Sequence, residues 1–272
     1  MGILDGKVAI VLGAAGKDNL GQVIARRFAA EGADVMVAGR HEDALAAIAG
    51  EIGGAWTLCD ITRKEDVGRL VDQTVERFGS VHVGVNSTGR GFVKTFEETS
   101  TEELEQMCAL QFIGPFQFFQ ALVRAMNEGG SIIQISSATA RIMMDDHAAY
   151  MGTKAGADHV IRCVANEFGA RNIRANSISP GFTPSPMTAR AARNPGVVEA
   201  FRREYPLGRV GTLADTAEAA LWLASDACFM TGENLQVNGG LMLRRNPTNA
   251  EIVASAAAAK AGRGPGGEAA KA

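Results

Sequence analysis

A tyrosine and a lysine stand four positions apart in the segment AAYMGTKAG, as Tyr150 and Lys154. On a helix this spacing places both side chains on one face, one turn apart. A lysine ammonium beside a phenol favours the phenolate, which lowers the pKa of tyrosine from about 10 and suits it to general acid–base catalysis. The spacing therefore indicates proton transfer to or from a substrate oxygen.

Two serines lie shortly before this segment. Ser136 ends the apolar run SIIQIS, and Ser137 follows it. Such a run predicts a buried parallel strand, and open α/β sheets bind their ligands at the carboxyl ends of strands. Taken singly, the tyrosine could be a packing residue and the lysine a solvated one. The combination of the three residue types favours an active site.

A glycine-rich segment, LGAAGKDNLG at 12–21, joins an apolar run to a helical pattern. Glycines at such a turn let backbone N–H groups approach a pyrophosphate, which the helix N-terminus stabilises. A glycine motif alone is weak evidence, because glycines also mark ordinary turns. In this context it predicts a dinucleotide-binding loop made of Gly13, Ala15, Gly16, Lys17, Asn19, Leu20 and Gly21.

The end of the second apolar run bears on the choice of cofactor. A site that prefers NAD usually has an acidic residue about 20 positions beyond the glycines, which accepts from the ribose hydroxyls. Here the run ends in AGR, and Arg40 together with Lys17 could pair with a 2'-phosphate. NADP(H) is therefore favoured. NAD(H) stays open, because both cations could be solvated and His41 or Glu42 follows.

The elements that must position these residues alternate between Lys7 and Met242. The predicted strands are residues 7–12, 34–39, 55–59, 81–86, 131–136, 173–178 and 234–238. The predicted helices lie near 20–31, 42–51, 64–78, 101–126, 148–169 and 214–225. No linker or repeat interrupts the alternation. It predicts a single-domain α/β fold, a Rossmann-like doubly wound sheet of about seven parallel strands flanked by helices.

Two segments depart from this alternation. Residues 182–210 form a long, proline-segmented connection, and long connections in compact domains are often lids. Residues 246–272 are rich in alanine and glycine, and could be a solvated extension or a helical arm onto another subunit. We expect this tail to be flexible. The sequence thus predicts a domain over 1–245, which includes the lid segment, and a tail over 246–272.

Composition narrows the classes of protein. The chain has 272 residues and 46% hydrophobic content, ample for a sizeable core. Because the net charge is −3, we expect no nucleic-acid partner. The N-terminus does not read as a secretion signal and no long uncharged apolar run follows, so we expect a cytoplasmic protein with no membrane span. Four widely separated cysteines predict no metal site and reduced, mostly buried thiols.

The order of these motifs resembles the short-chain dehydrogenase/reductase family, over about residues 5–243. Ser137, Tyr150 and Lys154 match the family's catalytic serine and its Tyr-x-x-x-Lys pair. The resemblance implies hydride transfer between a nicotinamide and a carbonyl or secondary alcohol, with Tyr150 exchanging the proton, Ser137 hydrogen-bonding the substrate oxygen and Lys154 binding the nicotinamide ribose. It also implies a homotetramer or homodimer. Further cofactor contacts would be Asp60, Ile61, Asn86, Ser87, Thr88, Gly89, Tyr150, Pro180, Gly181 and Thr183.

The glycine loop departs from the family's usual pattern. Gly13 and Gly21 lie eight positions apart instead of six, which is similar to the family's enoyl-thioester reductase branch. That branch places six residues between its tyrosine and lysine, whereas Tyr150 and Lys154 have three between them. Carbonyl and alcohol chemistry is therefore favoured. Enoyl reduction and a non-catalytic, nucleotide-binding regulatory protein remain the alternatives.

Two side chains also depart from the pattern, and the substrate is less well defined. Gln111, which we include among the catalytic residues, stands where the family often has a water-holding asparagine, and could serve that proton relay or displace the water. Ser185 replaces a commoner threonine.

Apolar loop residues favour an apolar substrate, with ordinary packing as an equal alternative. These residues are Phe92, Met143, Met144, Phe182 and Met187.

Overall fold

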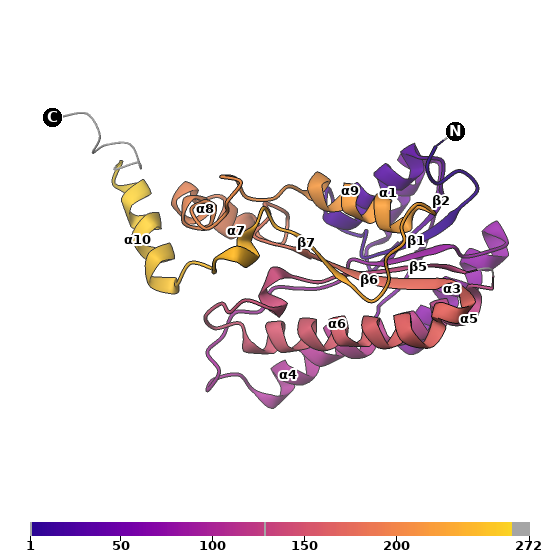
Figure 1. Ribbon diagram of the computed structural model, residues 1–272, viewed down its shortest axis with the longest axis horizontal. Helices are drawn as coiled ribbons and strands as arrows, with labels where there is room; N and C mark the ends of the chain where they lie inside the picture. The colour runs from indigo at the N-terminus through magenta and orange to yellow at the C-terminus, as the bar shows by residue number, and fades with distance from the viewer. Residues whose placement is uncertain (1, 128, 263–272) are drawn as a thin grey trace.

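A seven-stranded parallel sheet forms the centre of the molecule (Figure 1). The computed structural model describes residues 2–127 and 129–262. The strands lie in the order β3-β2-β1-β4-β5-β6-β7, and each neighbouring pair is parallel. Their bounds are Val8–Leu12 (β1), Asp34–Gly39 (β2), Ala55–Leu58 (β3), Val83–Asn86 (β4), Gly130–Ile135 (β5), Ile173–Pro180 (β6) and Asn234–Val237 (β7). The predicted doubly wound Rossmann-like sheet is confirmed.

Helices cover both faces of this sheet (Figure 1). One face carries α1 (Leu20–Ala30), α2 (Glu42–Ile52) and α9 (Leu213–Ala224). The other carries α3 (Lys64–Phe78), α4 (Thr101–Cys108), α5 (Gly114–Ala125) and α6 (Ala148–Phe168). Side chains of a strand point alternately to its two faces, so β1 contributes Val11 to the first core and Ile10 to the second. Burial on both faces explains the continuous apolar runs of the sequence.

The helix predicted over 101–126 is interrupted. Between α4 and α5 the residues Ala109–Ile113 (η1) form a π-helical turn. Pro115, in the first turn of α5, has no N–H to donate to the carbonyl four residues earlier, which belongs to Gln111. A wider turn accommodates that lost bond, and such turns occur often at functional sites. Gln111 consequently lies inside the π turn, and its side chain is buried.

The segment predicted as a lid, residues 182–210, folds into two short helices, α7 (Ala189–Ala192) and α8 (Pro195–Arg202). It carries a small apolar cluster separate from the two cores. Within this cluster the rings of Phe182 and Phe201 stack with centroids 4.4 Å apart. Met144 also packs here, so Phe182 and Met144, expected near a substrate, serve in packing.

The expectation of a flexible tail is wrong for residues 249–260. They form α10 (Asn249–Lys260), which begins at a capping box made by Thr248 and Glu251. The helix packs against α8 of the same chain, at the end of the molecule that carries the lid segment (Figure 1). The Asn249 amide donates to a carboxylate oxygen of Asp146 at 2.7 Å. Packing against α8, which local composition does not reveal, orders the helix; residues 263–272 of the predicted tail lie outside the described residues.

A glycine on α8 makes this contact possible. A Cβ added to Gly196 would lie 2.2 Å from the backbone oxygen of Ser255 on α10. We therefore expect Gly196→Ala to weaken the contact by about 1–3 kcal/mol, since overpacking of this kind shifts the backbone. Limited proteolysis should then cut the chain within α10. Gly50→Ala, on α2 in open space, is the control and should leave α10 protected; equal protection in both variants would contradict the expectation.

The cysteines are free, and their exposure differs from the prediction. Cys59 and Cys228 are buried, Cys108 is partly buried and Cys163 is exposed, because it lies on the outer side of α6. Burial raises the pKa of Cys59 to about 12.

In residues 2–127 and 129–262, no three His, Cys, Asp or Glu side chains gather as metal ligands would. None of the helices described there is both long and apolar enough to span a membrane.

Candidate active site

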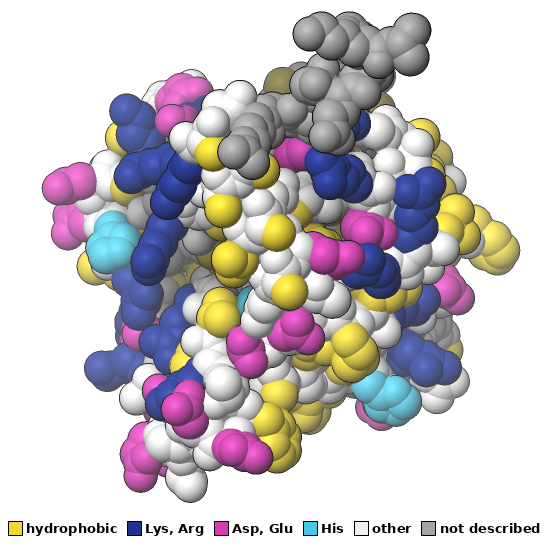
Figure 2. Space-filling view, turned by 90° about the vertical axis from the view of Figure 1, so that its left-hand side faces the viewer, with side chains coloured by type: hydrophobic (Ala, Val, Ile, Leu, Met, Phe, Trp, Pro, Cys, Tyr) yellow, Lys and Arg dark blue, Asp and Glu magenta, His cyan; other side chains and the backbone are white. Residues whose placement is uncertain are grey.

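The carboxyl ends of the strands meet at one edge of the sheet, on the side that carries α7, α8 and α10 (Figure 1). Figure 2 looks onto this side, where Lys and Arg side chains run along the left of the view and hydrophobic ones occupy its middle. The strand order reverses between β1 and β4. Open α/β sheets bind their ligands at such a switch point. The predicted glycine loop follows β1, and the predicted Asn86–Gly89 turn follows β4.

Helix α6 carries the predicted tyrosine and lysine on one side. Lys154 is 4% exposed, and its Nζ donates to the backbone oxygen of Ile135 at 2.8 Å. The same nitrogen lies 5.9 Å from the centroid of the Tyr150 ring. At this distance the ammonium lies within reach of the ring's electrons. The structure thus brings the two side chains together beside the end of β5.

The two serines after β5 have different environments. The Ser137 hydroxyl lies close enough to the Tyr150 phenol to lower the pKa of the phenol. The same hydroxyl lies 2.9 Å from that of Thr139. The Ser136 hydroxyl points the other way and donates to Asp158 at 2.7 Å. Successive residues of an extended segment face opposite sides, so Ser137 and not Ser136 joins Tyr150.

The ionisation of Tyr150 differs from the sequence-based prediction. We expected Lys154 to lower the pKa of the phenol, but burial raises the pKa of Tyr150, and the nearby Ser137 hydroxyl opposes this only in part. Burial likewise lowers the pKa of Lys154 from its usual 10.5 to about 8, against the opposing charge of Asp158. For each of these side chains, the loss of contact with water changes the pKa more than the neighbouring groups do. The chain therefore holds Tyr150 as a protonated phenol at neutral pH.

Gln111 faces the same place from the π turn. Its side-chain nitrogen donates to the Thr153 hydroxyl at 3.0 Å, whereas its Oε1 is buried without a hydrogen-bond partner. A Cβ added to Gly89 would lie 3.1 Å from this oxygen and 3.5 Å from Lys154 Nζ. The amide oxygen and the ammonium therefore converge above Gly89. A buried unpaired acceptor of this kind is rare and commonly marks a functional position.

The glycine loop closes on itself and on the turn after β4. Gly13 has φ +104°, and a Cβ there would lie 2.7 Å from the Ser87 hydroxyl oxygen. A Cβ at Gly21 would lie 2.7 Å from the Gly13 carbonyl oxygen. Asn19 donates to that same oxygen at 2.7 Å and caps α1 by accepting from the N–H of Gln22. Asn19 thus holds the end of the lengthened loop against Gly13, just before Leu20 begins the helix.

The two cations predicted for a 2'-phosphate lie at the surface. Lys17 and Arg40 are exposed, and neither makes a hydrogen bond or ion pair within residues 2–127 and 129–262. Arg40 directly follows Gly39, where a Cβ would lie 2.5 Å from that of Ala15. The close approach brings the end of β2 against the glycine loop. Both cations are therefore free to bind an anion near this loop.

The turn after β4 is held by Asn86, which is fully buried. Its amide donates to Gln134 at 2.8 Å, and its oxygen accepts from the N–H and hydroxyl of Thr88. Ser87 donates to the Leu12 carbonyl at 2.9 Å, which joins the turn to β1. Gly89 has φ +156° and presents no side chain to the site. These contacts fix the turn rigidly at the switch point.

The remaining predicted contacts lie after β3 and β6. Asp60 accepts from the N–H and hydroxyl of Thr62, and the Ile61 side chain is part of the core, so only the backbone of Ile61 can meet a ligand. Pro180 ends β6 and leads into Gly181. The Thr183 hydroxyl donates to the Gly181 carbonyl at 3.1 Å. Thus Gly181 and Thr183 lie together at the end of β6.

Two polar residues, one buried and one partly buried, were missed by the sequence reasoning. Gln134 holds Asn86, but as a glutamine inside an apolar run it carries no recognisable signal. Asp158 lies one helical turn beyond Lys154, among buried positions of α6. Its spacing from Lys154 could have been recognised, because residues four apart share a helix face.

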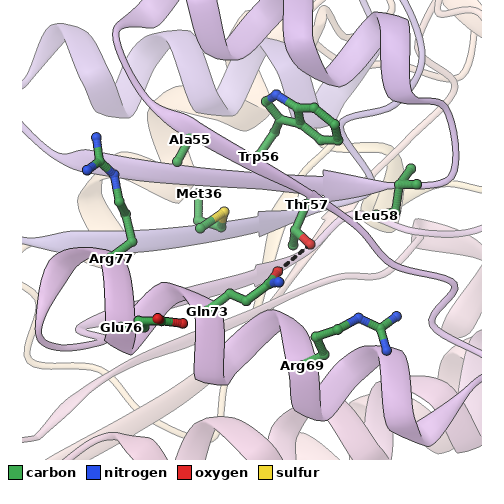
Figure 3. A pocket seen from close by; sticks show the side chains of 9 residues that line it. All are labelled: Met36, Ala55, Trp56, Thr57, Leu58, Arg69, Gln73, Glu76 and Arg77. Atoms are coloured by element: carbon green, nitrogen blue, oxygen red, sulfur yellow. Dashed lines mark hydrogen bonds between the residues drawn. The ribbon is translucent and has the colours of Figure 1, made fainter.

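A cavity of about 770 Å³ lies elsewhere, against β3 and α3 (Figure 3). It is bordered by Trp56, Leu58 and Arg69, among others, and Thr57 donates to Gln73 across it at 2.6 Å. None of the predicted catalytic residues borders it. The arrangement of Tyr150, Lys154 and Ser137 therefore locates the site better than cavity size does.

Comparisons with known proteins agree with this geometry. A family model described as enoyl-(acyl carrier protein) reductase matches residues 13–242. D-threitol dehydrogenase of Mycolicibacterium smegmatis is 32% identical over 89% of this chain and 95% of its own length. The chain belongs to the short-chain dehydrogenase/reductase family. L-fucose dehydrogenase of Bos taurus, 35% identical over 88% of this chain and 90% of its own, is a further relative of this short-chain dehydrogenase/reductase.

Solved structures of the short-chain dehydrogenase/reductase family share the whole fold. One from Mycobacterium ulcerans superimposes with a TM-score of 0.85 at 31% identity, over 90% of this chain and 92% of that one. The protein is an NAD(P)-dependent enzyme that acts on CH–OH or C=O groups. Its residues fit such a cofactor, because free cations flank the glycine loop and the unpaired Oε1 of Gln111 lies at the other end of the site.

Proposed function

We propose that this short-chain dehydrogenase/reductase uses NADP(H) to interconvert a carbonyl and a secondary alcohol. The observation that carries the proposal is the position of Lys154 beside the ring of Tyr150 on α6, with the Ser137 hydroxyl close enough to the phenol to lower its pKa. A purified sample mixed with NADPH and a panel of ketones should consume the reduced cofactor. Tight NADPH binding with no turnover of any ketone or alcohol would contradict the proposal.

In this mechanism the bound nicotinamide supplies or accepts the hydride. Tyr150, protonated at neutral pH because burial raises its pKa, donates its proton to a carbonyl oxygen and takes it back in the reverse direction. The Ser137 hydroxyl hydrogen-bonds the same substrate oxygen and stabilises its developing charge. The Lys154 ammonium binds the nicotinamide ribose and stabilises the phenolate that Tyr150 becomes.

The Oε1 of Gln111 completes a proton path in this proposal. It faces the space above Gly89 that Lys154 Nζ also faces. The amide does not carry the proton itself: its Oε1 would accept a hydrogen bond from the Lys154 ammonium, or from a water molecule that carries the proton onward. The glutamine therefore serves the relay in place of the family's asparagine, which its buried and unpaired oxygen supports.

The preference for NADP(H) rests on Lys17 and Arg40. Both are exposed cations beside the glycine loop with no partner in the described part of the chain. A guanidinium binds a phosphate through two parallel hydrogen bonds, so Arg40 would contact the 2'-phosphate most strongly. Asp60, Ile61 and the turn after β4 would contact the adenine side of the cofactor. Pro180, Gly181 and Thr183 would lie beside the nicotinamide.

Replacing Arg40 tests this preference. We expect Arg40→Ala to weaken NADPH binding about 10- to 100-fold, because it removes a charge-assisted hydrogen bond to the phosphate, and to change NADH binding little. Fluorescence titrations with both cofactors measure the two dissociation constants. Arg124→Ala, at an exposed arginine on α5, is the control and should leave both constants unchanged. Equal losses for NADPH and NADH would show that Arg40 does not bind the phosphate.

Enoyl-thioester reduction is the second candidate, favoured by the lengthened glycine loop and by the description of the matching family model. The spacing of Tyr150 and Lys154 and the two dehydrogenase relatives support alcohol chemistry instead. An enoyl thioester offered in the same assay distinguishes the two. A purely regulatory nucleotide-binding protein would bind NADPH and turn over neither substrate.

Further features of the proposal concern the substrate and the assembly. The exposed side chains of Met143 and Met187 support a substrate with an apolar part. The segment 182–210 would close over it as a lid.

We also propose a cytoplasmic homotetramer or homodimer, joined through the helices α4 to α6, whose face exposes Ile113 and Phe116. Sedimentation of a concentrated sample as a monomer would contradict the oligomer.

A further inference from the structure

A partly buried carboxylate, that of Asp158, lies on the far side of Lys154. Tyr150, Lys154 and Asp158 follow one another at intervals of one turn on α6, so Lys154 stands between the phenol and the carboxyl. Asp158 and Lys154 make no ion pair in contact, since the lysine nitrogen donates to Ile135 instead. The charge of Asp158 nevertheless raises the pKa of Lys154, although burial of the lysine lowers that pKa more.

The carboxyl of Asp158 is held by two other elements of the fold. The Ser136 hydroxyl, after β5, donates to its Oδ2 at 2.7 Å, and the Asn234 amide, on β7, donates to the same oxygen at 2.6 Å. Asn234 is itself fixed by Gln236, which donates to its side-chain oxygen at 2.7 Å. A carboxylate on the open surface usually moves freely and lacks hydrogen bonds of this kind to other elements of the fold. These contacts hold a negative charge at a fixed place below the lysine.

The second oxygen of Asp158 has no partner. Its Oδ1 is buried without a hydrogen bond, and so is the neighbouring Ser177 hydroxyl on β6. That hydroxyl lies close enough to lower the pKa of Asp158, although burial raises the pKa overall. A buried carboxyl that leaves an oxygen unpaired costs stability. An uncharged amide could accept the same two hydrogen bonds, so the feature to be explained is the charge of Asp158 one turn from Lys154.

We propose that Asp158 is a positioning residue, a fixed negative charge that keeps Lys154 in its ammonium form while the lysine is buried. The proposal rests on the proposed role of Lys154 as the cation beside Tyr150. Burial alone disfavours the ammonium, and a neutral amine would bind neither a ribose nor a phenolate as strongly. Asp158 opposes that loss without touching the substrate, the cofactor or the phenol.

Within the described part of the chain, no other charged group acts on Lys154. Around Lys154 the neighbouring elements present Tyr150 on α6, Gln111 on η1, Ser137 after β5 and Gly89 after β4, of which only the phenol titrates. Around Asp158 they present Ser136, Ser177 and Asn234, none of which titrates, besides Lys154. Asp158 is therefore the one acidic group that acts on Lys154 in residues 2–127 and 129–262.

The test measures the lysine itself, so that it does not depend on the proposed reaction. The protein is labelled with 13C at the lysine Cε, and the Lys154 signal is assigned by its loss in Lys154→Met. In the unaltered chain its titration midpoint should lie near the pKa of about 8. In Asp158→Asn we expect the midpoint to fall by about one pH unit, the effect of losing a neighbouring carboxylate. An unchanged midpoint in the folded variant would overturn the proposal.

Asparagine suits this position, because one oxygen can still accept both hydrogen bonds while the amide nitrogen faces the Ser177 hydroxyl. Asp158→Glu, which restores the charge, should return the midpoint towards that of the unaltered chain. Ser136→Ala removes a contact but no charge, and should leave the midpoint in place. If Asp158→Asn does not fold, Asp158→Ser gives the same reading: a fallen midpoint supports the proposal and an unchanged one overturns it.

A kinetic measurement gives a second reading. The high-pH limb of kcat/KM should move to lower pH in Asp158→Asn and stay in place in Ser136→Ala, because only the first variant changes the charge near Lys154. A residue with a purely structural role would lower the rate at every pH without moving the limb. A protein that turns over no substrate would contradict the proposed function, yet would leave the lysine titration interpretable.

Discussion

Replacing Tyr150 by phenylalanine is expected to lower kcat by about 10²- to 10⁴-fold, the usual contribution of a positioned general acid. The ring stays, so its contact with Lys154 should stay as well, and only the proton donor is lost. Steady-state kinetics with NADPH and a ketone measure the loss. Affinity for NADPH should be retained, because the phenol oxygen donates a proton and does not anchor the cofactor.

The chain supplies a matched control for this experiment in its other tyrosine. Tyr205 is 2% exposed, and its hydroxyl makes a long bond of 3.4 Å to the Phe182 carbonyl. Burial raises the pKa of Tyr205 as it does that of Tyr150, but the Tyr205 hydroxyl faces the Phe182 backbone, whereas Lys154 lies beside Tyr150. Tyr205→Phe should therefore keep most of the activity. Similar activity in Tyr150→Phe and the unaltered enzyme would refute the assignment of Tyr150 as the acid.

Lys154→Met is expected to abolish measurable turnover and to weaken cofactor binding, without a loss of folding stability at pH 7. Methionine fills a similar volume but carries no ammonium to bind a ribose or stabilise a phenolate. The stability expectation follows from burial, which lowers the pKa of Lys154 from 10.5 to about 8. At pH 7 the unaltered chain must bury a charge, and the variant does not.

The pH dependence of this difference has a definite sign. Between about pH 8 and pH 10.5 the unfolded chain keeps the proton of Lys154 and the folded chain has lost it. Stability rises with pH wherever the unfolded state binds more protons, so the unaltered chain gains stability across this window. Urea unfolding from pH 7 to pH 10.5 should show this gain in the unaltered chain and in Lys64→Met, at an exposed lysine, but not in Lys154→Met. Parallel curves for all three would contradict the expectation.

The two experiments separate two functions of one helix face. Tyr150→Phe should change the chemical step and leave binding, whereas Lys154→Met should change both. A variant that retained turnover after either change would direct attention to the enoyl-thioester alternative, since that branch uses a different tyrosine–lysine spacing.

Local patterns in the sequence determined the architecture and the placement of Tyr150 beside Lys154. The seven apolar runs became the seven strands of one parallel sheet, because burial on both faces leaves a signal in each run by itself. The spacing of Tyr150 and Lys154 placed both on one helix face, because four residues make about one turn. Signals of this kind need only neighbouring residues, so no knowledge of the fold was required.

Contacts between distant segments decided the rest. α10 is ordered by α8, and the π turn at Gln111 positions an amide oxygen over Gly89. Burial raised the pKa of Tyr150, where the spacing with Lys154 had suggested the opposite. Asp158 is held by residues after β5 and on β7, far from it in the chain. Only the tertiary structure decides which groups lose water and which charges meet, because both depend on segments that sequence order does not bring together.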